Sequence, residues 1–162
     1  MNLKNKLECF AGEACKLLFP ITVDIFKGHG SKVSVCTLSS IDLLIKISKS
    51  RLMNDLLIAG RLHSENKGVD KIIQFSISHP QLKFVVLCGK DTPGHCPGSA
   101  LIYLMNNGVD GNGKIIGSVS PSPFVHSDIA EVEQFRKQIT LIDMRNCFDV
   151  NKISETVYNL LV

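Results

Sequence analysis

Residues 82–105 read LKFVVLCGKDTPGHCPGSALIYLM, and this stretch decides the fold. The apolar run 82–88 predicts a buried strand, and residues 99–105 have the apolar spacing of an amphipathic helix. Between them, glycines and prolines hold His95 in a short loop. Strand followed by helix is the repeating unit of α/β proteins, which bind ligands at the carboxyl ends of parallel strands. We therefore expect His95 to lie at a ligand-binding edge of a sheet.

The rest of the chain repeats this alternation. Apolar runs with few polar interruptions predict strands buried on both faces at 32–38, 55–61, 82–88, 114–119 and 139–144. Apolar stripes at helical spacing follow most of them, around Val69, Leu101, Val132 and Ile153. Asn107-Gly108 predicts a helix end, and Ser127 or Asp128 a helix start. The pattern predicts an α/β fold, a doubly wound parallel sheet of about five strands.

Before the first strand, apolar residues from Leu3 to Leu18 recur at helical spacing and Pro20 ends the run. This predicts an amphipathic helix packed on the domain. Repeats, linkers and low-complexity segments are absent from the sequence. We therefore expect residues 1–162 to form a single domain.

Composition narrows the function. The formal net charge of +3 is spread without a basic block, and the chain has no Trp, which argues against nucleic acid as a partner. No apolar run approaches the roughly 20 residues that span a bilayer. Among the six cysteines there is no Cys-x-x-Cys pair, and Cys36 and Cys88 fall inside apolar runs. A reduced, cytoplasmic protein is expected.

Several common sites do not fit. Gly28-His29-Gly30 precedes a predicted strand instead of following it, so it does not match a dinucleotide-binding turn. Neither a Walker A sequence nor a Gly-x-Ser-x-Gly elbow occurs. Zinc needs three or four convergent ligands, and only His95 and Cys96 are close in sequence. Nucleotide cofactors, covalent hydrolysis and structural zinc are all disfavoured.

His95 precedes a predicted helix N-terminus, whose partial positive charge favours the neutral, metal-ligating imidazole. A single His suits a metal that arrives with its own equatorial ligands, as in a tetrapyrrole-like macrocycle. The alternative is a rigid loop with an incidental His. The pattern His95-x-x-Gly98 resembles the Asp-x-His-x-x-Gly loop of cobalamin-binding domains, but Pro93 stands where that motif has Asp, and the nearest aspartate is Asp91.

A longer similarity covers roughly residues 30–150. The segment IAGRLHSENKGVDK at 58–71 resembles the A subunit of tetrahydromethanopterin S-methyltransferase. Collinear with it are residues 35–38, His79-Pro80, FVVLCG at 84–89, Gly94-His95-x-x-Gly98, NGVD at 107–110, GKIIG at 113–117 and FRKQ at 135–138.

That resemblance implies a Rossmann-like, corrinoid-carrying protein that works with methyltransferase partner proteins. Its cobalt would cycle between Co(I) and methyl-Co(III), with His95 as lower axial ligand. The family's membrane anchor has no counterpart before Val162, so membrane attachment and sodium translocation are not expected here. The glycines at 89, 94 and 98 are expected to let the loop move.

The resemblance and the topology together place further residues around the cofactor: Ser40, Ser64, Glu65, Asn66, Gly94, Gly98, Ser99, Ser118, Ser120, Pro121 and Pro123. Two other functions stay open. One is a regulatory or interaction module that kept the fold without the cofactor. The other is an enzyme with a small-molecule substrate in the same crevice.

Overall fold

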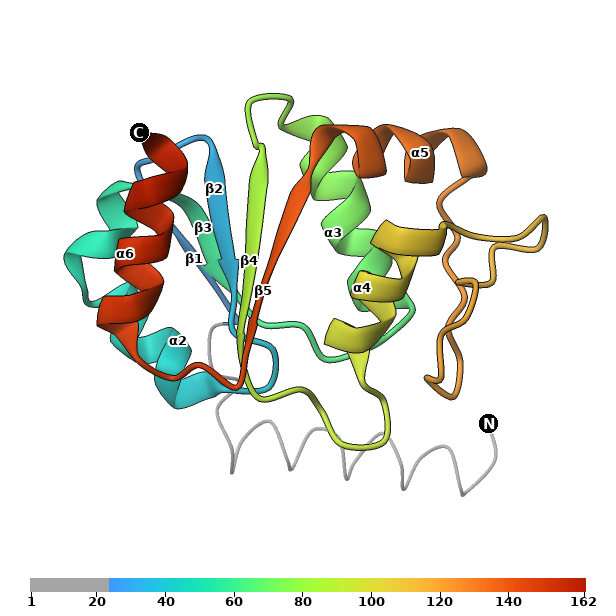
Figure 1. The fold of residues 1–162 in the computed structure, drawn as a ribbon, viewed down its shortest axis with the longest axis horizontal. Coiled ribbons are helices and arrows are strands. Elements are labelled where there is room, and N and C mark those ends of the chain that lie inside the picture. The colour runs from blue at the N-terminus through green and yellow to red at the C-terminus, as the bar shows by residue number, and fades with distance from the viewer. Residues whose placement is uncertain (1–23) are drawn as a thin grey trace, which may run out of the picture.

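The computed structural model describes residues 24–162, and a five-stranded sheet lies at its centre (Figure 1). The sheet has the order β1-β3-β2-β4-β5. Its strands are β1 (Ile25–Lys27), β2 (Val33–Cys36), β3 (Leu56–Gly60), β4 (Phe84–Gly89) and β5 (Thr140–Arg145). The helices are α2 (Ile41–Ser48), α3 (Lys67–Ser78), α4 (Pro97–Asn107), α5 (Ile129–Gln138) and α6 (Val150–Leu161), with a short 3₁₀ helix, η1 (Arg51–Asn54).

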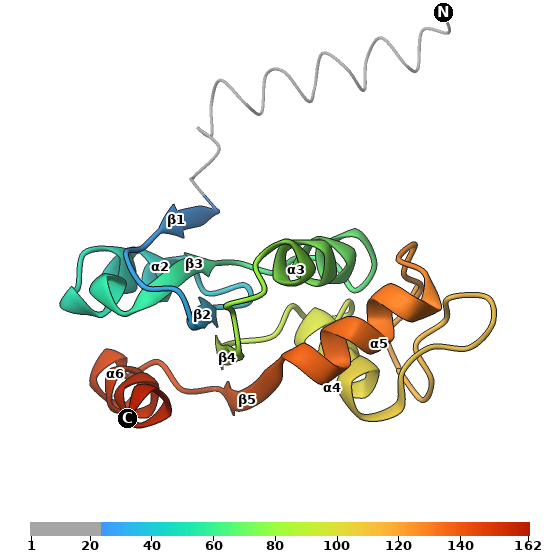
Figure 2. The ribbon, with the colours of Figure 1, turned by 90° about the horizontal axis from the view of Figure 1, so that it is seen from above.

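Strands β2, β3, β4 and β5 are parallel, and only the edge strand β1 is antiparallel to its neighbour. Helices cover both faces: α2 and α6 lie on one side, and α3, α4 and α5 lie on the other (Figure 2). The α/β fold and the largely parallel sheet predicted from the sequence are therefore confirmed.

Each face of the sheet has its own core. Val33 and Val35 of β2 pack with Leu44 and Ile47 of α2 and Ile153 of α6. On the other face, the core is built around the fully buried side chains of α3, α4 and α5 and the strand residues opposite them: Cys36, Ile73, Val85, Leu87, Leu101, Leu104, Val132 and Phe135. This two-sided burial explains why the parallel strands are almost continuously apolar.

Local sequence explains the helix boundaries. Asp128 accepts a hydrogen bond from the Glu131 amide while the Glu131 side chain accepts one from the Asp128 amide, forming a capping box at the start of α5. Pro97 occupies the first turn of α4, where its missing N–H costs nothing, and Gly108 ends that helix. The predicted helices around Val69, Leu101, Val132 and Ile153 are confirmed.

The expectation of a strand at 114–119 was wrong. The segment makes only isolated bridges, Val109 with Ile115 and Lys114 with Phe124. Ile115 is fully buried, whereas Ile116 and Val119 are 47% and 75% exposed, so one apolar anchor sits in an otherwise exposed loop. Prolines 121 and 123 follow, and they lack the N–H groups that a ladder requires.

Two elements were not predicted, β1 and α2. The amphipathic helix expected around Leu3–Leu18 lies outside the described residues. Within residues 24–162, no helix has the length and apolar character needed to cross a membrane.

The strand order creates a topological switch point between β2 and β4. The connection after β2 leads to α2 on one face, and the connection after β4 leads to α4 on the other (Figure 2). The two loops are joined there: Ser39 donates its amide and its hydroxyl to the Lys90 carbonyl at 3.0 and 2.7 Å, and Ser40 Oγ accepts from the Lys90 amide at 2.8 Å. Such a crevice is where open α/β sheets bind ligands.

Candidate functional site

The His95 loop leaves β4 at this carboxyl edge through a sharp turn. Gly89 has φ of +70°, and a Cβ there would meet Ser40 Oγ at 2.6 Å and the Thr37 carbonyl at 2.8 Å. Cys96 has φ of +45° and directly precedes α4. Only glycine fits at position 89, so the loop's departure from the sheet is fixed by packing.

Asp91 holds the far end of the loop against α4. Its Oδ1 accepts from the amides of Thr92 and Gly98 at 3.0 and 2.9 Å, and its Oδ2 accepts from the Ser99 amide at 2.9 Å. These are the amide groups that a helix N-terminus leaves unpaired. A Cβ on Gly98 would meet Leu38 at 2.8 Å. Asp91 therefore caps α4 and positions the loop without bonding to His95.

Glu65 is the partner of His95. His95 Nδ1 lies 3.0 Å from Glu65 Oε2, across a separation of 30 residues in the chain. The Glu65 side chain is 2% exposed and the His95 ring is 61% exposed. Glu65 Oε1 accepts from the Ser122 amide at 3.1 Å, so both carboxylate oxygens are engaged. A buried carboxylate thus fixes one ring nitrogen and leaves Nε2 toward solvent, without a protein partner among residues 24–162.

The segment 118–123 closes the site from the α4 side. Ser120 Oγ donates to the Cys96 carbonyl at 3.3 Å, and Ser118 Oγ accepts from the Ser120 amide at 3.3 Å. Pro123 accepts from the Ile115 amide at 2.7 Å through its carbonyl. Pro121 is exposed. The loop mistaken for a strand therefore supplies Ser120 and the Ser122 amide to the His95 site.

The remaining predicted residues have other structural roles. Ser64 Oγ accepts from the Gly68 amide at 2.8 Å, and Asn66 Oδ1 accepts from the Lys67 amide at 2.6 Å, so both cap α3. Ser40 joins the switch-point loops, as described above. Ser99 bonds to Asp91 through its amide. Gly94, with φ of +82°, has open space around it, and it is the loop glycine that packing leaves free.

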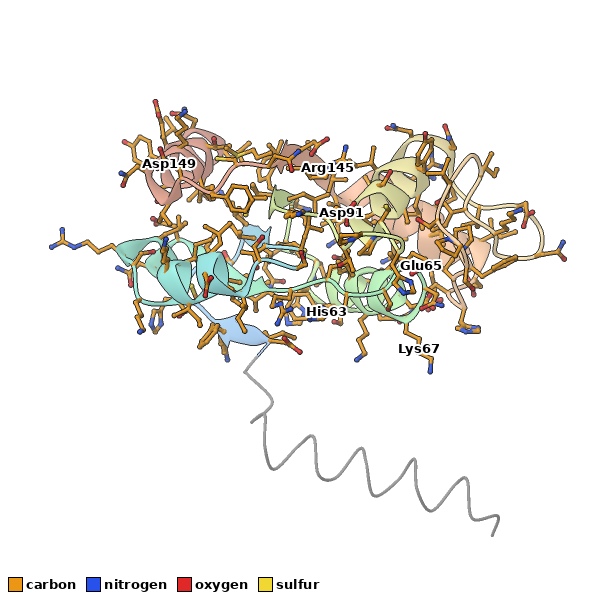
Figure 3. All side chains as sticks on the ribbon, turned by 90° about the horizontal axis from the view of Figure 1, so that it is seen from below. His63, Glu65, Lys67, Asp91, Arg145 and Asp149 are labelled. Atoms are coloured by element: carbon orange, nitrogen blue, oxygen red, sulfur yellow. The ribbon has the colours of Figure 1, made fainter. Side chains whose placement is uncertain are left out.

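A charged group borders the same edge at the end of β5. Arg145 bonds Asp143 through Nε and Nη2, both at 2.9 Å, and its Nη1 lies 4.0 Å from Asp91 Oδ2. The Arg145 guanidinium lowers the pKa of Asp143 by hydrogen bonding. Figure 3, which looks onto this edge, shows Arg145 beside Asp91 and Glu65 between α3 and α4.

The thiols at the switch point are inert. Burial raises the pKa of Cys36 to about 12, and burial also raises the pKa of Cys88. A thiol kept protonated at neutral pH is a poor nucleophile. The expectation that these cysteines act as small buried hydrophobes is confirmed by their burial in the two cores.

Sequence reasoning missed Asp91, Ser122 and Arg145 as parts of this site. Asp91 carried a usable signal, since an aspartate shortly before a helix start is a frequent cap. Ser122 contributes only its backbone amide, and Arg145 ends a strand whose neighbours are known only from the topology. For these two residues the sequence holds no local signal.

Comparison with known proteins is consistent with this geometry. The family MtrA, described as the A subunit of tetrahydromethanopterin S-methyltransferase, matches residues 22–162. The relative of that name from Methanocaldococcus jannaschii is 38% identical over 106 residues, covering 64% of this chain and 44% of the relative. The second such protein of Methanothermobacter marburgensis is 37% identical over 107 residues, covering 65% and 58%.

A further relative, named for the A subunit of a methyltransferase Mtx, comes from Methanosarcina acetivorans and is 32% identical over 140 residues, covering 85% of this chain and 67% of the relative. The chain spans about half the length of relatives such as those covered to 44% and 48%. The family match includes the β3, β4 and α4 elements that build the His95 site. The chain therefore belongs to the MtrA family, the family of the A subunit of tetrahydromethanopterin S-methyltransferase.

Proposed function

We propose that this chain binds a corrinoid, with His95 Nε2 as an axial ligand of its cobalt, and carries methyl groups between partner methyltransferase proteins. The hydrogen bond between Glu65 and His95 is the observation that carries the proposal. Metal-ligating histidines nearly always donate their other ring N–H to a carboxylate, a carbonyl or water, which fixes the tautomer and raises the basicity of the ligating nitrogen.

The residues present fit this group. Glu65 is buried and its second oxygen is held by the Ser122 amide, so it cannot swing away to follow the imidazole. The ring itself is 61% exposed, which leaves room for a large planar group above Nε2. In the related Asp-x-His-x-x-Gly loop an aspartate supplies the carboxylate; here Glu65 takes that place from the neighbouring strand-to-helix loop.

A bound corrinoid would supply a cobalt centre that accepts and releases a methyl group. The chain's part is to hold and orient. Asp91 and Gly89 fix both ends of the His95 loop, and the free conformation at Gly94 allows a small movement of the imidazole toward or away from a metal. Ser40, Ser99, Ser118, Ser120, Pro121 and Pro123 would border the macrocycle and its substituents.

Partner proteins follow from the relatives, each of which is named as one component of a methyltransferase. The substrate-binding sites of a methyl carrier lie on its partners, so the exposed His95 face is where they would approach. The methyl donor and acceptor would be bound by those partners.

The test is retention of a corrinoid by the purified chain. The protein is incubated with hydroxocobalamin, passed over a desalting column, and its visible spectrum recorded for wild type, His95→Ala and the control His126→Ala. We expect wild type and His126→Ala to keep the corrinoid and His95→Ala to lose it or show a different spectrum. A wild type that keeps no corrinoid would refute the proposal, and identical spectra in all three would refute the axial role of His95.

A further inference from the structure

A second cavity lies between the sheet and α3, on the side of that helix toward β1. Its volume is about 370 Å³, within the range of roughly 300–1,000 Å³ found for small-molecule sites. Its walls are mainly apolar and include Val35, Ile58, Leu62, Ile72, Phe75 and Leu82. Asp24 and Ile25, at the start of β1, border the opening.

Unpaired polar groups gather around this cavity. Among residues 24–162, the buried side-chain atoms without a hydrogen-bond partner are Ser34 Oγ, Arg61 Nε, Ser76 Oγ and Thr92 Oγ1. All but the threonine belong to residues that line the cavity. Ser76 is 1% exposed and Ser34 is 6% exposed. Buried polar atoms are rarely left unpaired, and three around one apolar hollow indicate a ligand that supplies their partners.

The rim of the cavity is positively charged. Lys67 and Lys71 of α3 are exposed and line it, and neither forms an ion pair within residues 24–162. Asp24, the acidic residue of the rim, already faces Arg61 at 3.2 Å and His63 at 3.4 Å. The rim therefore keeps a surplus of positive charge beside an apolar interior.

This cavity and the His95 site lie on different sides of α3. In Figure 3, Glu65 lies between α3 and α4, whereas His63 and Lys67 lie on the side toward β1. The cavity lining includes neither Glu65 nor His95. The two sites are thus separate, although Ser64 of the cavity lining directly precedes Glu65.

We propose that the cavity between β3 and α3 binds a small apolar molecule that carries one anionic group. The hydrocarbon part fills the space between β2, β3 and α3, where Ser34 and Ser76 bond to any polar atom that it carries. The anionic group lies at the opening, beside Lys67, Lys71 and Arg61. This assignment does not depend on whether a corrinoid binds at His95.

Octanoate and octanol are suitable probes because they share a chain and differ in charge. Each is titrated into the ¹⁵N-labelled full chain and amide shifts are followed by NMR. We expect octanoate to shift the amides of residues around Ser34, Arg61 and Ser76, and to bind about tenfold more tightly than octanol, the effect of a charge-assisted contact. Equal affinities, or shifts confined to other surfaces, would overturn the proposal.

Variants separate the two parts of the site. Ser76→Leu fills the interior and is expected to abolish binding of both probes. The double variant Lys67→Gln/Lys71→Gln, on an exposed helix face, is expected to weaken octanoate several-fold and to leave octanol unchanged. Lys152→Gln, on α6 across the sheet, is the matched control and should change neither. Unchanged octanoate binding in the double variant would overturn the role of the rim.

Hydroxocobalamin provides the last check. Because the two sites are separate, saturating corrinoid should leave the octanoate affinity unchanged. Displacement of octanoate by hydroxocobalamin would show that the cavity belongs to the corrinoid site, and would overturn its assignment as a second site.

Discussion

Glu65 Oε2 and His95 Nδ1 lie 3.0 Å apart, and they join the loop after β3 to the loop after β4. The pair combines a carboxylate that is almost fully buried with an imidazole that is mostly exposed. A buried carboxylate without partners would be costly, so the contacts from His95 and the Ser122 amide hold Glu65 where it is. The same contacts present His95 Nε2 to solvent.

Removing the carboxylate should weaken both folding and binding. Glu65→Ala leaves the Ser122 amide and His95 Nδ1 without their partner, and we expect a loss of about 1–3 kcal/mol in the free energy of unfolding, measured with urea. Glu65→Gln keeps the shape and should lose less. In both variants we expect corrinoid affinity to fall about 10–100-fold, as for other carboxylates behind a ligating His. Wild-type affinity in Glu65→Gln would contradict this role.

Asp91 should act on stability through the α4 N-terminus. Because it accepts amide hydrogen bonds from Gly98 and Ser99, Asp91→Ala should cost about 0.5–2 kcal/mol, the usual range for an N-terminal cap. Asp149→Ala, which removes the bond to the Asn151 amide at the start of α6, is the matched control on stability. Only the Asp91 variant should also alter corrinoid binding, since only that cap positions the His95 loop.

Gly89 and Gly94 should respond differently to the same substitution. Both have positive φ, of +70° and +82°, but a Cβ at Gly89 meets Ser40 and Thr37, whereas one at Gly94 meets nothing. Gly94→Ala should therefore cost only the left-handed conformation, about 1–2 kcal/mol. Gly89→Ala adds overpacking, for a total on the order of 2–5 kcal/mol. Equal losses in thermal or urea unfolding would show that the crowding at Gly89 is relieved without cost.

Asp143 should give stability a dependence on pH. Arg145 lowers the pKa of Asp143 in the folded chain below its ordinary value of 3.8. The ionised carboxylate therefore stabilises the folded state above that ordinary value, and the contribution is lost as the pH falls through the lowered folded-state pKa. Because Asp143 is 44% exposed, the effect should be small, about 0.2–1 kcal/mol.

The measurement compares wild type with Asp143→Asn by urea unfolding at pH 7 and at pH 3. We expect the wild type to be more stable at pH 7 and the difference to shrink at pH 3. A difference that grows on acidification would contradict the ion pair with Arg145.

Most of the fold could be predicted because burial on both faces leaves a strong apolar signature. The strands β2, β3, β4 and β5 all showed it. The error at 114–119 arose because Ile115, Ile116 and Val119 give the same local pattern, while only Ile115 reaches the core. β1 has three residues, with Ile25 58% exposed, so its place in the sheet depends on pairing with β3.

The site was predictable only in part. His95 was identified by its loop, and Glu65 by its place after a strand. Their contact joins residues 30 apart and depends on the packing of α3 beside α4. That packing is a property of the folded chain, which no local pattern in the sequence contains. Whether Ser40, Ser99 and Ser118 touch a cofactor stays a prediction.

The most direct test of the account is whether a histidine nitrogen of this chain bonds to cobalt. The full chain, grown with ordinary or ¹⁵N-labelled histidine, is loaded with hydroxocobalamin, freed of unbound corrinoid and reduced to the Co(II) state for electron paramagnetic resonance. We predict that ¹⁵N labelling changes the nitrogen splitting of the cobalt signal, and that His95→Ala abolishes this change. A splitting that is the same with either isotope would contradict ligation by His95.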